Sequence, residues 1–267
     1  MQLIDFPFAY TYLTRLKNYR AVCTVAMYEW TPLAIVLKLI YDVDVGFIAL
    51  MLAGWLALYE CGYVINDQSD SSREMGGDRL QGFRINTRRF WISHALVFTT
   101  SLGTIWILYG EKTTAVFASV CAIVFCVFLF HTSQWVRRVR FLRIATFSTL
   151  AMYKFAPLIL PSVPVFDSQL ILMATFLCYG FPRVVVYALR KFGHSDNSVA
   201  AERSGPLLGW ASTIAFGPLL LAQRWDTSYA RAVALIWLCY GITATSFLIS
   251  RQVRSSILKQ AQTLCEP

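Results

Sequence analysis

A group of oxygen-bearing side chains follows the second apolar stretch of the chain. Its members are Asn66, Asp67, Asp70 and Glu74. Their spacing of i, i+1, i+4 and i+8 places all of them on one broad face of a helix that continues past the apolar stretch. Carboxylates gathered in this way repel one another unless a cation lies between them, and oxygen ligands without Cys or His favour Mg²⁺ over Zn²⁺. The pattern therefore predicts a Mg²⁺ site that leaves coordination positions for substrate phosphates.

An alternative interpretation of this group is a solvated helix end where acidic residues happen to fall. Against it, Asn66 and Asp67 directly follow an apolar run and lie in a basic loop, where the positive-inside rule favours Lys or Arg. We therefore expect the group to be functional.

A second polar segment begins at Tyr187 and continues to Asn197. Tyr187 and Lys191 are spaced i, i+4 at the end of an apolar run, so they face the same way on a helix. The lysine could neutralise a phosphate and the tyrosine could donate a hydrogen bond to one. The alternative is an interfacial tyrosine and a snorkelling lysine, both of which are common at membrane boundaries.

Two cations lie inside apolar runs, at Lys154 and Arg183. A charge at the centre of a membrane costs about 2.5–3.5 kcal/mol or more, so each cation is expected to face the interior of a bundle and meet an anion. Arg183 follows Pro182, where a helix could break and free backbone groups to line a cavity. Either cation could contact a diphosphate, and Lys154 could instead pair with a carboxylate. His94 and His131 are isolated and are expected to be structural.

The elements that carry these residues are predicted to be transmembrane helices. The chain is 57% hydrophobic and 15% charged, whereas soluble domains carry about 25% charged residues. About eight apolar runs approach the length needed to cross a bilayer: 21–41, 46–65, 91–110, 114–131, 144–160, 169–190, 206–223 and 230–250. Because these runs are continuous rather than alternating, they exclude a β-barrel. We expect a single domain over residues 1–267, an all-α polytopic bundle of about eight or nine helices.

The net charge of +9 follows the topology rather than indicating nucleic acid. With eight helices, the N-terminus, loops 65–90, 132–143 and 190–205 and the C-terminal tail share one side, and most of the basic residues lie there. The positive-inside rule makes that side cytoplasmic. The seven cysteines form no CxxC pair or Cys/His cluster, and the chain has no Gly-rich phosphate loop or zinc signature.

The first motif resembles that of the UbiA superfamily of intramembrane prenyltransferases. That family carries N-D-x-x-D-x-x-x-D between its second and third helices, and this chain matches it in register, with Glu74 as a conservative change at the last position. Tyr187 and Lys191 match the start of the second family motif, Y-x-x-x-K followed by acids. Phe192 and Ser195 stand where those acids are expected, and Asp196 is the acid that remains close by.

The resemblance implies a Mg²⁺-dependent transfer of a polyprenyl group from its diphosphate to a hydrophobic or aromatic acceptor within membrane lipid. It implies metal ligands at Asn66, Asp67, Asp70, Glu74 and Asp196. It implies diphosphate contacts at Asn66, Lys154, Arg183, Arg190 and Lys191, with catalytic roles for Asp67, Asp70, Tyr187 and Lys191. With the second motif incomplete, Arg183, Arg190 and Lys191 could replace one metal ion with fixed positive charge.

Alternatives with the same fold remain open. The chain could be a terpene cyclase without an acceptor, or a transferase that moves phosphoribose onto a lipid phosphate. A different class is a noncatalytic membrane protein that binds an isoprenoid. The incomplete second motif favours this last class, whereas the preserved first motif favours an enzyme.

Overall fold

The computed structural model of the chain is almost entirely helical where it describes residues, namely 5–16, 18–71, 85–193, 197, 207–209, 211, 214–215, 228, 230–242, 245–246 and 249. Within those residues there is no strand. Among the described residues, four helical stretches are long and apolar enough to cross a membrane: Val45–Gln68, Thr87–Tyr109, Glu111–Thr132 and Val165–Lys191. Shorter apolar helices cover Thr31–Tyr41 and Ala230–Ile242. The predicted helical membrane-protein class is therefore confirmed, while the total of eight or nine spans and the single domain stay predictions.

The longest α-helices in the described part of the chain correspond to three of the predicted apolar runs. They are α4 (Val45–Ser71), α5 (Thr87–Tyr109) and α6 (Glu111–Thr132). α4 is longer than its apolar run because it continues through the acidic residues to Ser71. Asn66, Asp67 and Asp70 therefore share one continuous helix, as their spacing predicts.

Two other runs form helical stretches that contain π-helical turns. The first comprises α2 (Tyr19–Val25), η3 (Ala26–Trp30) and α3 (Thr31–Tyr41). The second comprises α10 (Val165–Thr175), η5 (Phe176–Gly180) and α11 (Phe181–Lys191). The break expected at Pro182 is absent, because this proline lies in the first turn of α11, where its missing N–H is tolerated. The backbone irregularity lies one step earlier, in η5.

The run predicted at 144–160 is interrupted. It forms α8 (Arg140–Tyr153) and α9 (Ala156–Ile159), with Lys154 and Phe155 between them. The short helix α7 (Gln134–Arg138) precedes α8, and the Ser133 side chain accepts a hydrogen bond from the Val136 N–H at its start. Most of the run predicted at 206–223 lies outside the described residues.

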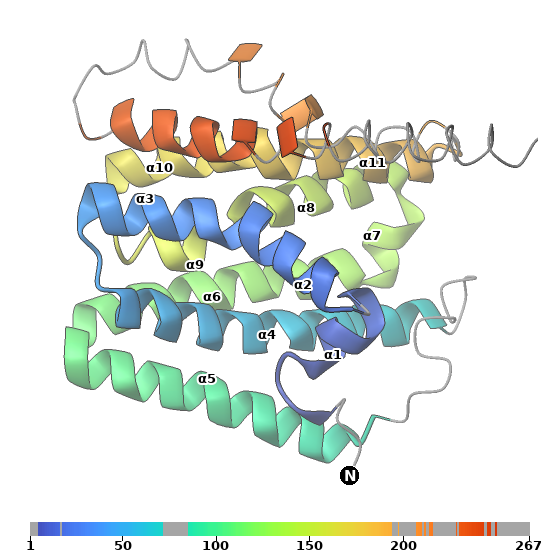
Figure 1. Ribbon diagram of the computed structural model, residues 1–267. Helices are drawn as coiled ribbons and strands as arrows, with labels where there is room; N and C mark the ends of the chain where they lie inside the picture. The colour runs from blue at the N-terminus through green and yellow to red at the C-terminus, as the bar shows by residue number, and fades with distance from the viewer. Residues whose placement is uncertain are drawn as a thin grey trace, which may run out of the picture.

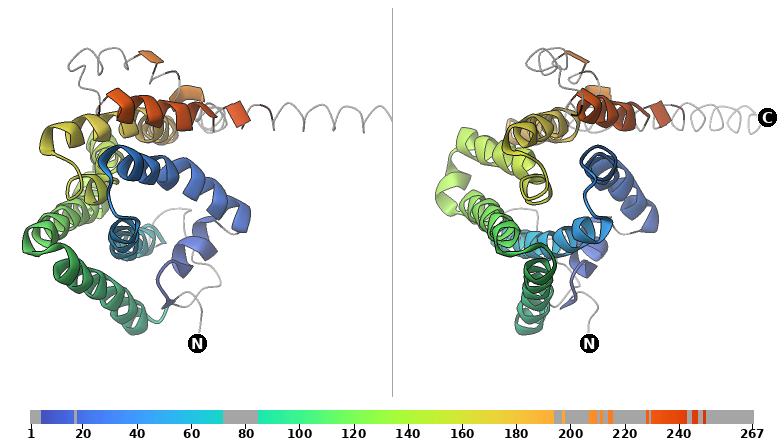
Figure 2. Two further views of the ribbon diagram at one scale, coloured as in Figure 1. Left: turned by 60° about the vertical axis from the view of Figure 1, so that its left-hand side comes forward. Right: turned by 90° about the vertical axis from the view of Figure 1, so that its left-hand side faces the viewer.

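The helices pack into one bundle in which α4 contacts α5 and α6, and α8 contacts α6 and α11 (Figure 1). The chain curves round so that the early helices approach the later ones (Figure 2). The Tyr41 hydroxyl at the end of α3 donates to Asp167 Oδ2 in the first turn of α10 at 3.1 Å. Gly62 allows α4 to approach α6 closely, because a Cβ at that position would lie 2.9 Å from the Phe128 ring.

The two ends of the bundle differ in charge. The end of α4, the start of α5, α7 and the end of α11 lie together on the right of Figure 1, whereas the connections from α3 to α4 and from α5 to α6 lie on the left. The right-hand end carries the basic residues Arg88, Arg89, Arg137, Arg138, Arg140, Arg143, Arg190 and Lys191. The loops predicted to share one side therefore do so where they are described, and their cytoplasmic orientation stays a prediction.

Candidate functional site

The end of α4 presents Asn66 and Asp67 to two other parts of the chain. Asp67 is buried, with 4% of its surface exposed, and its Oδ2 accepts a hydrogen bond of 2.6 Å from the Tyr10 hydroxyl. Asn66 Nδ2 lies 3.4 Å from Asp67 Oδ1. The Arg137 guanidinium in α7 donates to Asn66 Oδ1 at 3.2 Å and to the Asn66 carbonyl at 3.3 Å. The first motif is thus linked to the N-terminal segment and to the basic connection between α6 and α8.

The second motif lies in the same region, around His131 at the end of α6. The His131 Nδ1 lies 2.7 Å from Thr146 Oγ1, and its ring lies 6.1 Å from that of Tyr187. Tyr187 also stacks on Phe147 of α8 at 4.1 Å, and Lys191 Nζ lies 5.7 Å from the centre of the Tyr187 ring. Tyr187 and Lys191 therefore lie on the same side of α11, as their i, i+4 spacing predicts.

The turn between α6 and α7 connects these two groups of residues. The ring of His131 at the end of α6 lies 6.1 Å from that of Tyr187, and Arg137 in α7 donates to Asn66 Oδ1 at 3.2 Å. The two motif positions, about 120 residues apart in the sequence, therefore face one polar region at the same end of the bundle.

A second polar cluster lies deeper between the helices and is built on Glu29. Its carboxylate accepts a hydrogen bond from Lys154 Nζ at one oxygen and from the Arg183 guanidinium at the other, the latter at 2.6 Å. The side chains of Glu29 and Lys154 are buried, whereas that of Arg183 is 47% exposed. Lys154 and Arg183 thus face the bundle and meet an anion, as expected. One carboxylate facing two cations leaves one positive charge on this trio.

Aromatic rings surround these cations. Lys154 Nζ lies 5.1 Å from the ring centres of Trp30 and Tyr179 and 5.4 Å from that of Tyr59. The Arg183 guanidinium carbon lies 4.3 Å from the Tyr179 ring. Such contacts stabilise a desolvated cation by about 2 kcal/mol. Closer to Asp67, the rings of Tyr59, Tyr63 and Phe128 pack edge to face, which gives the region between the two clusters an aromatic lining.

The charged members of the Glu29 cluster all lie at irregularities in the helices. Glu29 belongs to η3, Lys154 lies in the turn between α8 and α9, and Arg183 follows η5 within one turn. π-helical turns occur frequently at functional sites. Irregular backbone is tolerated at membrane depth where protein buries it or where it lines a cavity. The backbone as well as the charges therefore marks this cluster as a candidate site.

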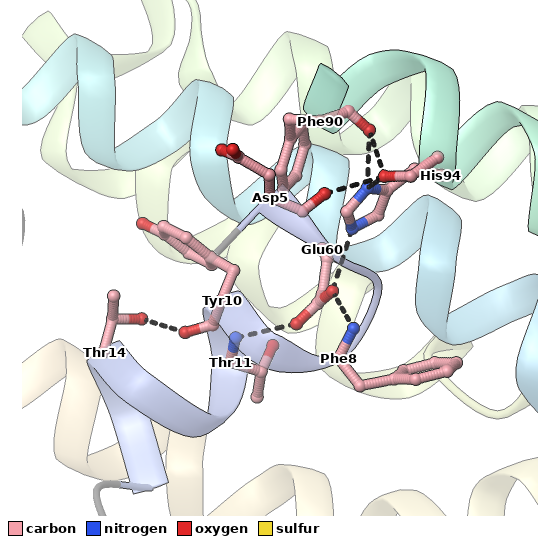
Figure 3. Close-up of polar contacts among 9 residues, drawn as sticks. Asp5, Phe8, Tyr10, Thr11, Thr14, Glu60, Phe90 and His94 are labelled. Carbon is pink, nitrogen blue, oxygen red and sulfur yellow. Dashed lines mark hydrogen bonds and ion pairs between the residues drawn. The ribbon is translucent and has the colours of Figure 1, made fainter. Parts of the chain in front are cut away.

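A third buried polar group centres on Glu60 of α4 (Figure 3). Its carboxylate accepts hydrogen bonds from the N–H groups of Phe8 and Thr11, the latter at 2.7 Å, and lies 3.0 Å from His94 Nε2. His94 Nδ1 lies 2.7 Å from the carbonyl oxygen of Phe90. Through Glu60, His94 links α5 to α4 and to the N-terminal segment.

Several predicted site residues lie outside what the structure describes. Glu74 and Asp196 are among them, and Asp70 is described only by its helical backbone. Arg190 is exposed near the end of α11. In the described part of the chain no group of three or more His, Cys, Asp or Glu side chains could hold a metal ion. The donors that are described, the oxygens of Asn66 and Asp67, are of the hard type that Mg²⁺ prefers.

Sequence reasoning missed several residues that the structure places in these clusters. Glu29 and Glu60 could have been found, because an acidic residue inside an apolar run is a functional candidate in a membrane protein. Tyr10 gave no such signal, since it precedes the first apolar run and is an ordinary interfacial residue by type. Arg137 was counted only as part of the basic side.

No protein-family model, curated protein or solved structure matches the chain. The functional argument therefore depends on the residues themselves and on their arrangement.

Proposed function

We propose that the chain is a Mg²⁺-dependent intramembrane prenyltransferase of the UbiA type, which moves a polyprenyl group from its diphosphate to a hydrophobic or aromatic acceptor. One observation carries the proposal. Asn66 and Asp67 at the end of α4 and Tyr187 and Lys191 on α11 border one polar region, in which Arg137 binds Asn66 and His131, six residues before Arg137, lies against Tyr187. A dianionic or trianionic headgroup needs both acidic residues for a cation and basic residues for direct contact, and this region supplies both.

Asn66, Asp67 and Asp70 would hold the Mg²⁺, with Glu74 and Asp196 as further candidate ligands. A bound Mg²⁺ would offset phosphate charge and make the diphosphate a better leaving group. The chain's own cations would act on the same charge, with Arg137 bound to Asn66 and with Arg190 and Lys191 in the last turn of α11. This fixed positive charge compensates for the acids that Phe192 and Ser195 replace.

The reaction begins when the C–O bond of the prenyl diphosphate breaks and the diphosphate leaves with the bonding electron pair. Basic side chains stabilise the negative charge that develops on the departing group. The prenyl fragment left behind is an allylic carbocation, which the aromatic faces of Tyr59, Tyr63 and Phe128 can stabilise. An electron-rich atom of the acceptor then forms the new bond and the product loses a proton.

The Glu29 cluster supports the same function from a greater depth. Arg183 keeps part of its guanidinium exposed while Glu29 and Tyr179 fix its position. Tyr59 on α4 lies eight residues before Asp67, a rise of about 12 Å along the helix. Lys154 and Arg183 are therefore placed below the headgroup region, where Arg183 can contact the diphosphate or a polar group of the acceptor and Lys154 holds Glu29 in place.

A noncatalytic isoprenoid-binding protein is the second candidate, favoured by the missing acids at Phe192 and Ser195. Thermal unfolding of the purified protein, with and without Mg²⁺ and a series of prenyl diphosphates, provides the first test. A ligand that binds the folded state raises the unfolding midpoint by mass action. We expect stabilisation that requires Mg²⁺, depends on chain length and is lost in Asp67→Asn and Asp70→Asn. The control is Asp44→Asn, an exposed acid at the other end of α4, which should respond as the wild type does.

Turnover of a labelled prenyl diphosphate separates the candidates. Release of diphosphate together with prenylated product supports the transferase, and release with a cyclised hydrocarbon supports the cyclase. Mg²⁺-dependent binding without turnover supports the noncatalytic protein. The absence of any stabilisation by diphosphates would remove the transferase and the cyclase and would make the noncatalytic protein the first candidate.

A further inference from the structure

We propose that Tyr10 is a positioning residue for Asp67, presented by an N-terminal segment that Glu60 holds against α4. The proposal rests on the proposed function, because it concerns the carboxylate that would hold Mg²⁺. The N-terminal segment lies before the first apolar run, and nothing in its sequence marks it as part of the site.

The contact between the two side chains is short and buried. The Tyr10 side chain has no exposed surface and packs against Cys61, Val64 and Phe90. Its hydroxyl donates to Asp67 Oδ2 at 2.6 Å. A buried carboxylate requires hydrogen-bond donors. A hydrogen bond from a hydroxyl to a carboxylate oxygen is short and strong. This bond fixes the plane of the Asp67 carboxylate and so determines how its oxygens face the headgroup region.

The backbone around Tyr10 is fixed by Glu60. Glu60 lies seven residues before Asp67, which places both acids on one face of α4, two turns apart. The N–H groups of Phe8 and Thr11, on either side of Tyr10, both donate to the Glu60 carboxylate. Phe8 adopts a left-handed conformation with φ of 72°, which is unusual for a bulky residue and is maintained by this contact. Figure 3 shows the carboxylate of Glu60 between the N–H groups of Phe8 and Thr11, on either side of Tyr10.

Three further hydrogen bonds stabilise the segment. Before the turn, the Asp5 carboxylate accepts the N–H of Asn86 at 2.8 Å and the Asp5 carbonyl accepts the Ser93 hydroxyl at 2.7 Å. Within the segment, the Thr14 hydroxyl donates to the Tyr10 carbonyl at 2.7 Å. The segment is thus bound to the start of α5 before Tyr10 and, through Glu60, to α4 on both sides of Tyr10. Its phenol is consequently presented to Asp67 without freedom to turn away.

The test uses Tyr10→Phe, which keeps the ring that packs on Phe90 and removes only the hydroxyl. Mn²⁺ in place of Mg²⁺ permits a titration by electron paramagnetic resonance, in the presence of farnesyl diphosphate and without turnover. Removal of a group that orients a metal ligand lowers metal affinity by about 10–100-fold. We expect the half-saturating Mn²⁺ concentration to rise by about tenfold in Tyr10→Phe, while a cooperative unfolding transition of the metal-free variant shows that it still folds.

Tyr12→Phe is the matched control, because Tyr12 is a partly exposed tyrosine two residues away in the same segment. Glu60→Gln tests the attachment of the segment without touching Tyr10, and we expect a shift in the same direction. If the wild type binds Mn²⁺ and farnesyl diphosphate while Tyr10→Phe and Glu60→Gln bind them equally well, Tyr10 is only a packing residue. If the wild type itself shows no binding, the proposed function fails first and the inference with it.

Discussion

Glu29 is the residue on which the deeper polar cluster depends, because its two oxygens accept from Lys154 and Arg183 separately. Removing one partner of a buried ion pair leaves an uncompensated charge, which is more damaging than removing both. The contribution of this buried ion pair to stability can therefore be tested by comparing the unfolding free energies of single and double variants.

We expect Lys154→Met to lower the free energy of unfolding by about 3 kcal/mol, the lower end for a broken buried pair, because Arg183 still faces Glu29. The double variant Lys154→Met with Glu29→Gln should recover part of that loss, since the buried charge is then removed as well. Chemical or thermal unfolding in detergent measures both values. Lys38→Met provides the control, since Lys38 pairs with Asp42 on the surface and should contribute less than about 0.5 kcal/mol. Equal losses at Lys38 and Lys154 would contradict the buried-pair interpretation.

At the scale of the helix, α4 connects the features described above, since Gly62, Glu60 and Asp67 all lie on it. Its first turn is fixed by Asp44, whose side chain accepts the Phe47 N–H at 2.9 Å and the Tyr109 hydroxyl at 2.8 Å. These two hydrogen bonds lower the pKa of the Asp44 carboxyl below its usual range. The bond from the Phe47 N–H has the larger effect and that from the Tyr109 hydroxyl the smaller. Because the pKa is lower in the folded state, the ionised group stabilises the fold above the unfolded pKa of about 4, and this contribution is lost as the pH falls.

Asp44→Asn isolates this contribution, because asparagine can cap the helix but does not titrate. We expect the unfolding midpoint of the wild type to fall more steeply than that of Asp44→Asn between about pH 5 and pH 3. Midpoints measured at intervals of pH for both proteins give the difference directly. Parallel curves for the two proteins would show that Asp44 does not titrate differently in the folded and unfolded states.

Replacement by alanine should change the stability of the protein in opposite directions at two glycines, because only one of them lies at the close approach of α4 to α6. A Cβ at Gly62 would lie 2.9 Å from the Phe128 ring, whereas a Cβ at Gly103 of α5 would have nothing within 4 Å. Gly62→Ala should therefore destabilise the protein by about 1–3 kcal/mol through overpacking. Gly103→Ala should stabilise it by up to about 1 kcal/mol, because alanine is the better helix former. Unfolding midpoints of the two variants test this, and stabilisation by Gly62→Ala would contradict the close packing.

At the scale of the helix, the sequence predicted the features that depend on residues close together in the chain. The apolar runs predicted α4, α5 and α6, because a membrane span depends on length and hydropathy alone. The spacing of Asn66 and Asp67 placed them on the continuing helix, and the lone cations Lys154 and Arg183 were expected to meet an anion. The identity of that anion, Glu29, and the contact of Tyr10 with Asp67 depend on how distant segments pack. Spacing along the chain contains no information on such contacts, and the same is true of the π-helical turns.

For the whole molecule, the unequal charge of the two ends predicts its orientation in the membrane. α6 has 22 residues, which at 1.5 Å per residue span about 33 Å and cross a hydrocarbon core of about 30 Å. Lys112 lies at one end of this helix and Arg138 lies just beyond the other, and both are exposed. By the positive-inside rule we expect the end with Arg138 to face the cytoplasm, together with the first motif.

Cysteine labelling at these two positions tests the orientation. In a variant whose native cysteines are replaced by serine or alanine, we introduce Lys112→Cys or Arg138→Cys and treat sealed vesicles of known orientation with a membrane-impermeant maleimide. In right-side-out vesicles Lys112→Cys should be labelled and Arg138→Cys should be protected until the membrane is permeabilised. Inside-out vesicles should give the reverse. Labelling of Arg138→Cys from the outside would place Asp67 and Tyr10 at the extracytoplasmic surface, and a cytoplasmic pool of prenyl diphosphate could then not reach the site that we propose.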